Sequence, residues 1–257
     1  MDVIEQGSEV RIEVCTSLSD IRECVNLQRI IWRDPDEDLI PSSLFIIAKK
    51  IGGQVLLARD GKRAVGFALA FPAFHGKVRY LHSHIVGVVP EYQNHGLGRK
   101  IKQKQRELAL SAQITLMEWT FDPLALRNAY FNVVRLGAIV REFSPNLYGV
   151  TASPLHAGLP TDRLVAEWWM ASSRVASALA GVAPTAGSDA VEIRVPADIE
   201  EWKSSALPRA VEAQASLKQQ FQERFAQGFG VTGFRIEDGN GMYLLERLKD
   251  PADPAAS

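Results

Sequence analysis

Apolar and polar positions follow two different periods along this chain. Residues 10–16 alternate as in a half-buried strand, whereas Ile21, Val25 and Trp32 follow the capping residue Ser19 at helical spacing. Asp60-Gly61 lies between two apolar runs and predicts a hairpin. The patterns predict the following order: strand 10–16, helix 19–32, helix 42–52, two strands within 54–71, strand 77–89, helix 100–112, strand 114–121, helix 124–136, and strands 138–143 and 163–170.

The C-terminal quarter has a different composition. Residues 171–190 are mostly Ala, Ser, Gly, Val and Pro, which is typical of a linker or a weak helix. A strand, a helix and a hairpin are predicted beyond it, with one helix face formed by Ala213, Leu217, Phe221 and Phe225. We expect this small β-α-β-β unit to pack on the first domain or on a second copy in a homodimer. The predicted division is a domain over 1–170, a linker over 171–190, an accessory unit over 191–249 and a frayed tail over 250–257.

Composition and charge narrow the possible functions. The 257 residues are 46% hydrophobic and 23% charged, with a net charge of −1, so a broad surface for nucleic acid or an anionic membrane is not expected. No stretch has the roughly 18 apolar residues of a membrane helix, and the N-terminus does not resemble a signal peptide, so we expect a cytoplasmic protein. Cys15 and Cys24 have neither a disulfide framework nor metal-ligand spacing, and we expect buried thiols.

One loop, PEYQNHGLGRK at residues 90–100, joins an apolar strand to a helix. Gly96 and Gly98 permit unusual backbone angles and carry no side chain, while the first N–H groups of the following helix point back toward the loop. The helix dipole and the charges of Arg99, Lys100 and Lys102 suit a phosphate or pyrophosphate. The alternative is a turn without a ligand.

Two familiar phosphate loops do not fit this spacing. A dinucleotide-binding fingerprint needs a third glycine where Ile101 stands. A P-loop needs Lys followed by Ser or Thr where Arg99 and Lys100 stand.

The pattern Gln93-x-x-Gly96-x-Gly98, after an apolar strand and before a helix, resembles the acyl-CoA motif of the GNAT superfamily of N-acyltransferases. The resemblance covers residues 10–170 in element order and leaves 190–257 outside it. It implies an α/β (α+β) fold with a mixed, mostly antiparallel sheet flanked by helices, and acetyl-CoA or another acyl-CoA as co-substrate without a metal. It also implies that backbone groups of Val88 and Val89 contact the pantetheine and acyl carbonyl. The residues that would hold the phosphates are Gln93, Asn94, His95, Gly96, Leu97, Gly98 and Arg99.

Acyl transfer to an amine needs a proton acceptor. His82, on the strand before the loop, is our first candidate for the base, and alternation puts His84 on the same face. The competing interpretation is that both histidines are hydrogen-bonded structural residues. Glu118, on the strand at 114–121, is a second candidate, and it too has a competing interpretation as a solvated or paired carboxylate.

The family places a tyrosine acid before the glycine that ends the next helix, but here counting back from Gly137 reaches Val133. Tyr130 lies one helical turn away, and we predict that it takes the place of this tyrosine as the acid. Asn128 is a poor helix former, and by resemblance we expect it to bind the pantetheine arm.

These observations predict an N-acyltransferase that moves an acetyl or small acyl group from acyl-CoA to a primary amine by direct attack. The expected acceptor is a small molecule such as an amino acid. Two alternatives remain: a protein lysine or N-terminal acyltransferase, and a non-catalytic acyl-CoA-binding module.

Overall fold

The computed structural model describes residues 10–32, 39–149 and 158–248. The chain divides into two compact units, residues 1–117 and residues 118–257. This division falls at a different point from the predicted linker, part of which forms helix α5 (Ser173–Leu179). The predicted tail over 250–257 lies outside the described residues.

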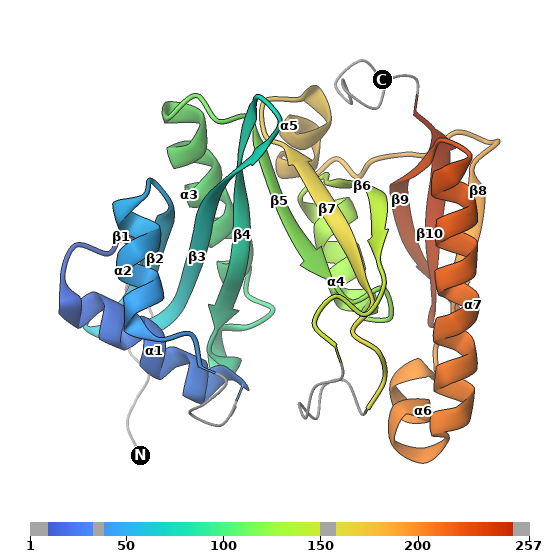
Figure 1. Ribbon diagram of the computed structural model, residues 1–257, viewed down its shortest axis with the longest axis horizontal. Helices are drawn as coiled ribbons and strands as arrows, with labels where there is room; N and C mark the ends of the chain where they lie inside the picture. Colours follow the sequence, from blue (N-terminus) through green and yellow to red (C-terminus); the bar gives the residue numbers. More distant parts are fainter. Residues whose placement is uncertain (1–9, 33–38, 150–157, 249–257) are drawn as a thin grey trace. The chain divides into compact units, whose positions relative to one another are not determined.

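The first unit is built on four strands in antiparallel order, with three α-helices (Figure 1). The strands are β1 (Arg11–Val14), β2 (Gln54–Asp60), β3 (Arg63–His75) and β4 (Val78–Val88). The helices are α1 (Leu18–Trp32), α2 (Ser42–Lys50) and α3 (Leu97–Ser111), and a 3₁₀ turn, η2 (Pro90–Tyr92), follows β4. The predicted hairpin is confirmed at Gly61, whose φ of 56° suits glycine.

The helices of this unit cover both faces of its strands. Phe67 of β3 packs against Trp32 of α1 and Phe45 of α2, with ring centroids 5.9 and 6.1 Å apart. The neighbouring Gly66 faces the other way, where an added Cβ would lie 3.1 Å from the Ile101 side chain of α3. Because successive residues of a strand point to opposite faces, α1 and α2 cover one face and α3 covers the other.

Strand β4 carries a β-bulge in its middle. Ile85 pairs with Leu69 and Ser83 pairs with Ala70, so His84 is an extra residue without a partner on β3. His82 pairs with Phe71, which lies on the same face of β3 as Phe67. The alternation of side chains between the two faces of the sheet is therefore shifted by one residue on passing the bulge in β4.

The second unit has its strands in the order β5-β7-β6-β9-β10-β8. Antiparallel pairs join β6 to β7, β6 to β9, β9 to β10 and β10 to β8. The elements are β5 (Leu116–Phe121), which begins in the first unit, α4 (Leu126–Ala129), the π-helical turn η3 (Tyr130–Arg135), β6 (Ile139–Ser144), β7 (Arg163–Trp169), α5, β8 (Val191–Val195), α6 (Ile199–Ser205), α7 (Leu207–Ala226), β9 (Phe229–Glu237) and β10 (Asn240–Arg247). The predicted α/β class, with mostly antiparallel strands flanked by helices, is confirmed.

The prediction of one continuous α-helix over 124–136 is wrong. The structure has one short α-helical turn followed by the wider π-helical turn, although Gly137 ends the segment with a φ of 77° as expected. Widening by one residue changes which side chains share a face after Ala129.

The C-terminal strands and α7 pack within the second unit. Phe221 of α7 stacks on Phe143 of β6, with centroids 6.0 Å apart, and the Tyr243 hydroxyl donates to the Pro123 carbonyl over 2.8 Å. The buried face of α7 contains Gln214 where Ala213 was predicted. In the first unit β1 pairs with β2, the first strand of its hairpin, whereas in the second unit β8 pairs with β10, the second strand of its hairpin.

Across the described residues, no helix is both long and apolar enough to cross a membrane.

Candidate active site

The loop between β4 and α3 has the backbone of an anion cradle. Asn94 and Gly96 adopt positive φ angles of 63° and 82°, which turn the chain so that α3 begins at Leu97. The backbone N–H groups of residues 94–98 donate to no acceptor among the described residues. A Cβ added to Gly98 would have no atom within 4 Å, so open space lies beside the backbone of this residue. Consecutive free N–H groups at a helix N-terminus suit a phosphate.

Contacts with the β2–β3 turn hold the start of this loop. The Tyr92 hydroxyl donates to Asp60 Oδ2 over 2.5 Å, and this hydrogen bond raises the pKa of Tyr92. Arg63 and Glu91 form a salt bridge of 3.0 Å, but both side chains are exposed, so it adds little. The tyrosine is therefore the main anchor of the loop.

Backbone groups near the end of β4 are partly occupied. Val89 donates its N–H to the Val65 carbonyl over 3.0 Å and accepts from Tyr92 N–H over 2.9 Å. Gln93 Nε2 donates to the Val88 carbonyl over 2.9 Å. Because neighbouring residues of an antiparallel strand point their polar groups to opposite edges, the Val88 N–H faces away from β3. Of the two valines predicted to contact the co-substrate, Val88 is half-buried, whereas Val89 is buried.

The prediction that the Lys102 side chain lies at the phosphate loop is wrong. Lys102 is 3% exposed on the buried side of α3, where its Nζ donates to Ser83 Oγ over 2.8 Å. Burial lowers the pKa of Lys102 well below its usual value. Arg99 and the exposed Lys100 stay in the first turn of the helix, at the loop.

The two histidines of β4 lie side by side, as alternation predicted. Their ring centroids are 6.0 Å apart, and His84 makes an edge contact with Phe71 at 5.6 Å. Burial, with smaller contributions from His84 and Lys102, lowers the pKa of His82 to about 4. Burial also lowers the pKa of His84. His82 is therefore unprotonated at neutral pH, and it is a weaker base than an ordinary histidine.

The remaining predicted residues belong to the second unit. Glu118 is buried and has an interaction partner, which agrees with its interpretation as a paired carboxylate. Asn128 is exposed, whereas Asn132 is buried and accepts from Trp119 Nε1 over 3.2 Å, so only Asn128 is available to a ligand. Tyr130 is 39% exposed and Val133 is fully buried, so these two side chains lie on different faces of the helical segment.

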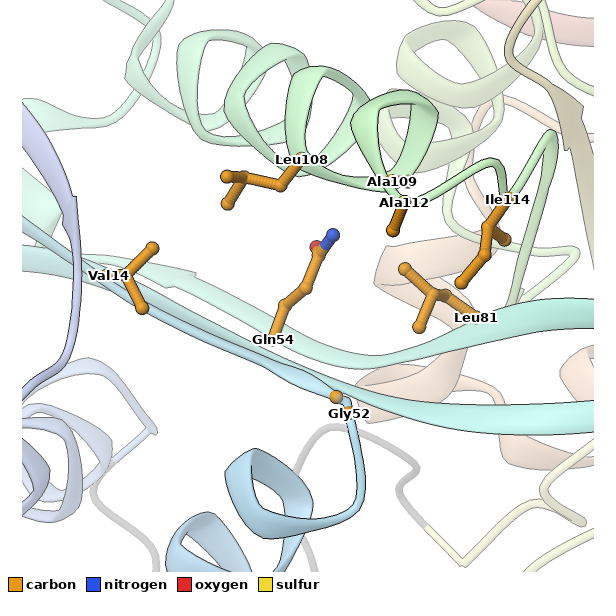
Figure 2. A pocket seen from close by; sticks show the side chains of 9 residues that line it. Val14, Gly52, Gln54, Leu81, Leu108, Ala109, Ala112 and Ile114 are labelled. Carbon is orange, nitrogen blue, oxygen red and sulfur yellow. The ribbon is translucent and has the colours of Figure 1, made fainter.

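A cavity of about 220 Å³ lies between β2 and α3, lined by Val14, Gly52, Gly53, Gln54, Leu81, Leu108, Ala109, Ala112 and Ile114. Figure 2 shows Gln54 reaching across it from the strand toward the helix. Its Nε2 donates to the Gln105 carbonyl over 3.0 Å. None of the residues of the phosphate loop lines this cavity.

Sequence reasoning missed the polar side chains between β4 and α3. Ser83 is buried, and its hydroxyl contacts both Lys102 and Gln105. The signal was available on a helical wheel, because Lys102 and Ala109 are seven residues apart and so share the buried side of α3 with Gln105.

Comparison with known proteins agrees with this geometry. Residues 21–130 match the Acetyltransferase (GNAT) family. The chain therefore carries a GNAT acetyltransferase domain, the domain of a class of acyl-CoA-dependent acyltransferases. No curated protein is significantly similar to it in sequence.

Three solved structures illustrate the shared fold. The acetyl-CoA complex of yncA from Salmonella typhimurium has a TM-score of 0.50 at 18% identity, over 63% of this chain and 94% of that one. The ribosomal-protein-S18-alanine N-acetyltransferase from Escherichia coli has a TM-score of 0.50 at 13% identity, over 70% and 98%. A GNAT acetyltransferase from Streptococcus pneumoniae has a TM-score of 0.50 at 16% identity, over 62% and 98%.

Proposed function

We propose that the protein transfers an acetyl or small acyl group from acyl-CoA to the amine of a small molecule such as an amino acid. The observation that carries this proposal is the loop at residues 94–98, whose backbone donors have no protein acceptor among the described residues and whose Gly96 and Gly98 have open space at their Cβ positions. The GNAT family match covers that loop.

In this proposal the loop binds the pyrophosphate and the Val88 N–H, which faces away from β3, meets the pantetheine. Bound acyl-CoA supplies an acyl group activated as a thioester. The amine nitrogen forms a C–N bond with the acyl carbon, the C–S bond breaks, CoA leaves as the thiolate and one proton leaves the nitrogen. No covalent intermediate with the protein is needed.

His82 is our proposed acceptor of that proton. Its pKa of about 4 lies about 6 units below that of an alkyl ammonium ion, so taking a proton from the free ammonium would cost about 8 kcal/mol. His82 therefore acts on amine that has already lost its first proton to solvent. It accepts the second proton as the C–N bond forms, because the nitrogen then becomes much more acidic.

The proposed roles in the second unit are secondary. Asn128, exposed on α4, is proposed to bind the pantetheine arm, and the exposed Tyr130 hydroxyl is proposed to protonate the leaving thiolate. Glu118 is kept as an alternative base. A thiol has a pKa near 8.5, so its thiolate leaves at neutral pH at a cost of about 2 kcal/mol even without an acid.

A small acceptor is supported by the chemistry around His82. Among the described residues, its neighbours on the same face are rings, His84 and Phe71, and no carboxylate that would select a cationic peptide acts on His82. The cytoplasmic location and the homodimer stay predictions.

Titration calorimetry with acetyl-CoA and with free CoA tests binding. We expect micromolar affinity for both ligands, and no binding of either would refute the proposal. Release of CoA thiol is then measured with the twenty amino acids, with an unblocked peptide and with an N-acetylated lysine peptide. Turnover with a peptide only would assign the protein as a protein acyltransferase, and binding without any turnover would assign it as a non-catalytic acyl-CoA-binding module.

A further inference from the structure

The buried position of Lys102 is energetically unfavourable. It lies on the inner side of α3 with Leu97, Ile101 and Ala109 and is 3% exposed. Removing an ammonium group from water costs several kcal/mol, and an apolar side chain of similar length would avoid that cost. Residues that break the packing rule in this way are expected where function requires them.

The Lys102 ammonium belongs to a small polar group between α3 and β4. It donates to Ser83 Oγ over 2.8 Å and lies 3.9 Å from Met117 Sδ. The same Ser83 hydroxyl lies 3.3 Å from Gln105 Oε1. Apolar side chains surround the adjoining cavity, including Leu81, which precedes His82 on β4 (Figure 2). Two side chains of one helix thus hold a single hydroxyl of the strand.

That hydroxyl belongs to the residue next to the bulge. Ser83 lies between His82 and His84, and His84 is the extra residue of the bulge. Because side chains alternate along a strand, moving the bulge by one residue, from His84 to Ser83, would pair His84 with Ala70 and turn its side chain toward the α3 face. Fixing Ser83 on the α3 face therefore keeps the rings of His82 and His84 together on the other face, 6.0 Å apart.

We propose that Lys102 is a positioning residue for acyl transfer, which anchors the β4 bulge through Ser83 and places a positive charge behind His82. This inference rests on the proposed function, because His82 is the base of that reaction. The titratable groups that act on His82 are His84 from its own strand and Lys102 from α3. Lys102 adds to the lowering of the His82 pKa, after the larger effects of burial and His84.

The test compares Lys102→Met with Lys104→Met, a change of the same kind on the same helix. Lys104 is half-buried and forms an i,i+3 salt bridge with the exposed Glu107, so its replacement controls for loss of one lysine. Ser83→Ala and the double variant Lys102→Met/Ser83→Ala complete a double-mutant cycle, which measures the coupling between the two side chains. The measurements are the melting temperature, the Kd for acetyl-CoA, kcat with the best amine of the acceptor panel, and the pKa of His82 from NMR of ¹³C-labelled histidine.

For Lys102→Met we expect an unchanged or higher melting temperature, a Kd within threefold of wild type and a kcat at least tenfold lower. The pKa of His82 should rise, because a nearby positive charge is removed. The double variant should lose no more kcat than the worse single variant. A structural role alone would leave the His82 pKa unchanged, so an unchanged pKa or an unchanged kcat in Lys102→Met overturns the inference. Failure of the wild-type protein to bind acetyl-CoA would instead refute the proposed function.

Discussion

Replacing Gly98 with valine separates a phosphate cradle from a simple turn. Gly98 lies in the first turn of α3, and its added side chain would meet no protein atom within 4 Å. Valine also has a better helix propensity than glycine by a few tenths of a kcal/mol, so we expect the variant to be at least as stable as wild type. Gly96 could not be used in this way, because its φ of 82° would strain any other residue.

The loss of binding can be estimated from the donors that the valine would cover. A hydrogen bond to a charged group contributes about 1.5–3 kcal/mol, so blocking two of the free N–H groups costs about 3–6 kcal/mol. Since each 1.4 kcal/mol is about tenfold in affinity, the Kd for acetyl-CoA should rise by about a hundredfold or more.

Calorimetry gives the Kd, and circular dichroism gives the melting temperature. Gln103→Val is the matched control, because Gln103 is an exposed residue of the same helix. A folded Gly98→Val protein whose Kd lies within threefold of the control would refute the cradle, and with it the main support for the enzyme assignment.

Three further outcomes follow from the described contacts. His82→Asn should lower kcat by about a hundredfold. The loss should be the same at every pH from 6 to 9, because the pKa of about 4 leaves His82 unprotonated throughout this range. A loss confined to one side of pH 6.5 would contradict that pKa. The Sγ atoms of Cys15 and Cys24 lie 3.8 Å apart in the core, and their hydrogen bond together with burial raises the pKa of Cys24. Neither thiol should therefore react with a disulfide reagent until urea unfolds the protein. Tyr243→Phe leaves the Pro123 carbonyl without its donor and should lower the free energy of unfolding by about 1–3 kcal/mol in urea titrations, whereas an unchanged value would show that the carbonyl finds another donor.

The sequence predicted most of the secondary structure because alternation and helical spacing are local properties. The β2–β3 hairpin, α3 and the chain reversal at Gly137 all follow from residues close together in the sequence. The bulge at His84 could not be predicted in the same way, because it depends on the pairing of β4 with β3. The π-helical turn at Tyr130–Arg135 has no distinctive sequence pattern, and it was read as ordinary helix.

The site was predicted unevenly for the same reason. The loop was found because its glycines and the following helix are contiguous, and free N–H groups are a property of the backbone. The role of Lys102 was misassigned because its charge was placed by sequence distance from the loop. A helix turns by about a third of a circle within one residue, so a lysine near a phosphate site in sequence can face the core.

The bulge joins these observations into a physical account of how the site is held. An antiparallel pair without an anchor can accommodate an extra residue at several neighbouring positions, at similar cost in ladder hydrogen bonds. In this protein the α3 side chains hold the residue before the bulge, and the N-terminus of the same helix presents the free N–H groups of the loop. One rigid helix therefore fixes both the proposed binding site for the co-substrate phosphates and the orientation of the proposed base, so that the polar, costly position of Lys102 has a reason that packing alone does not supply.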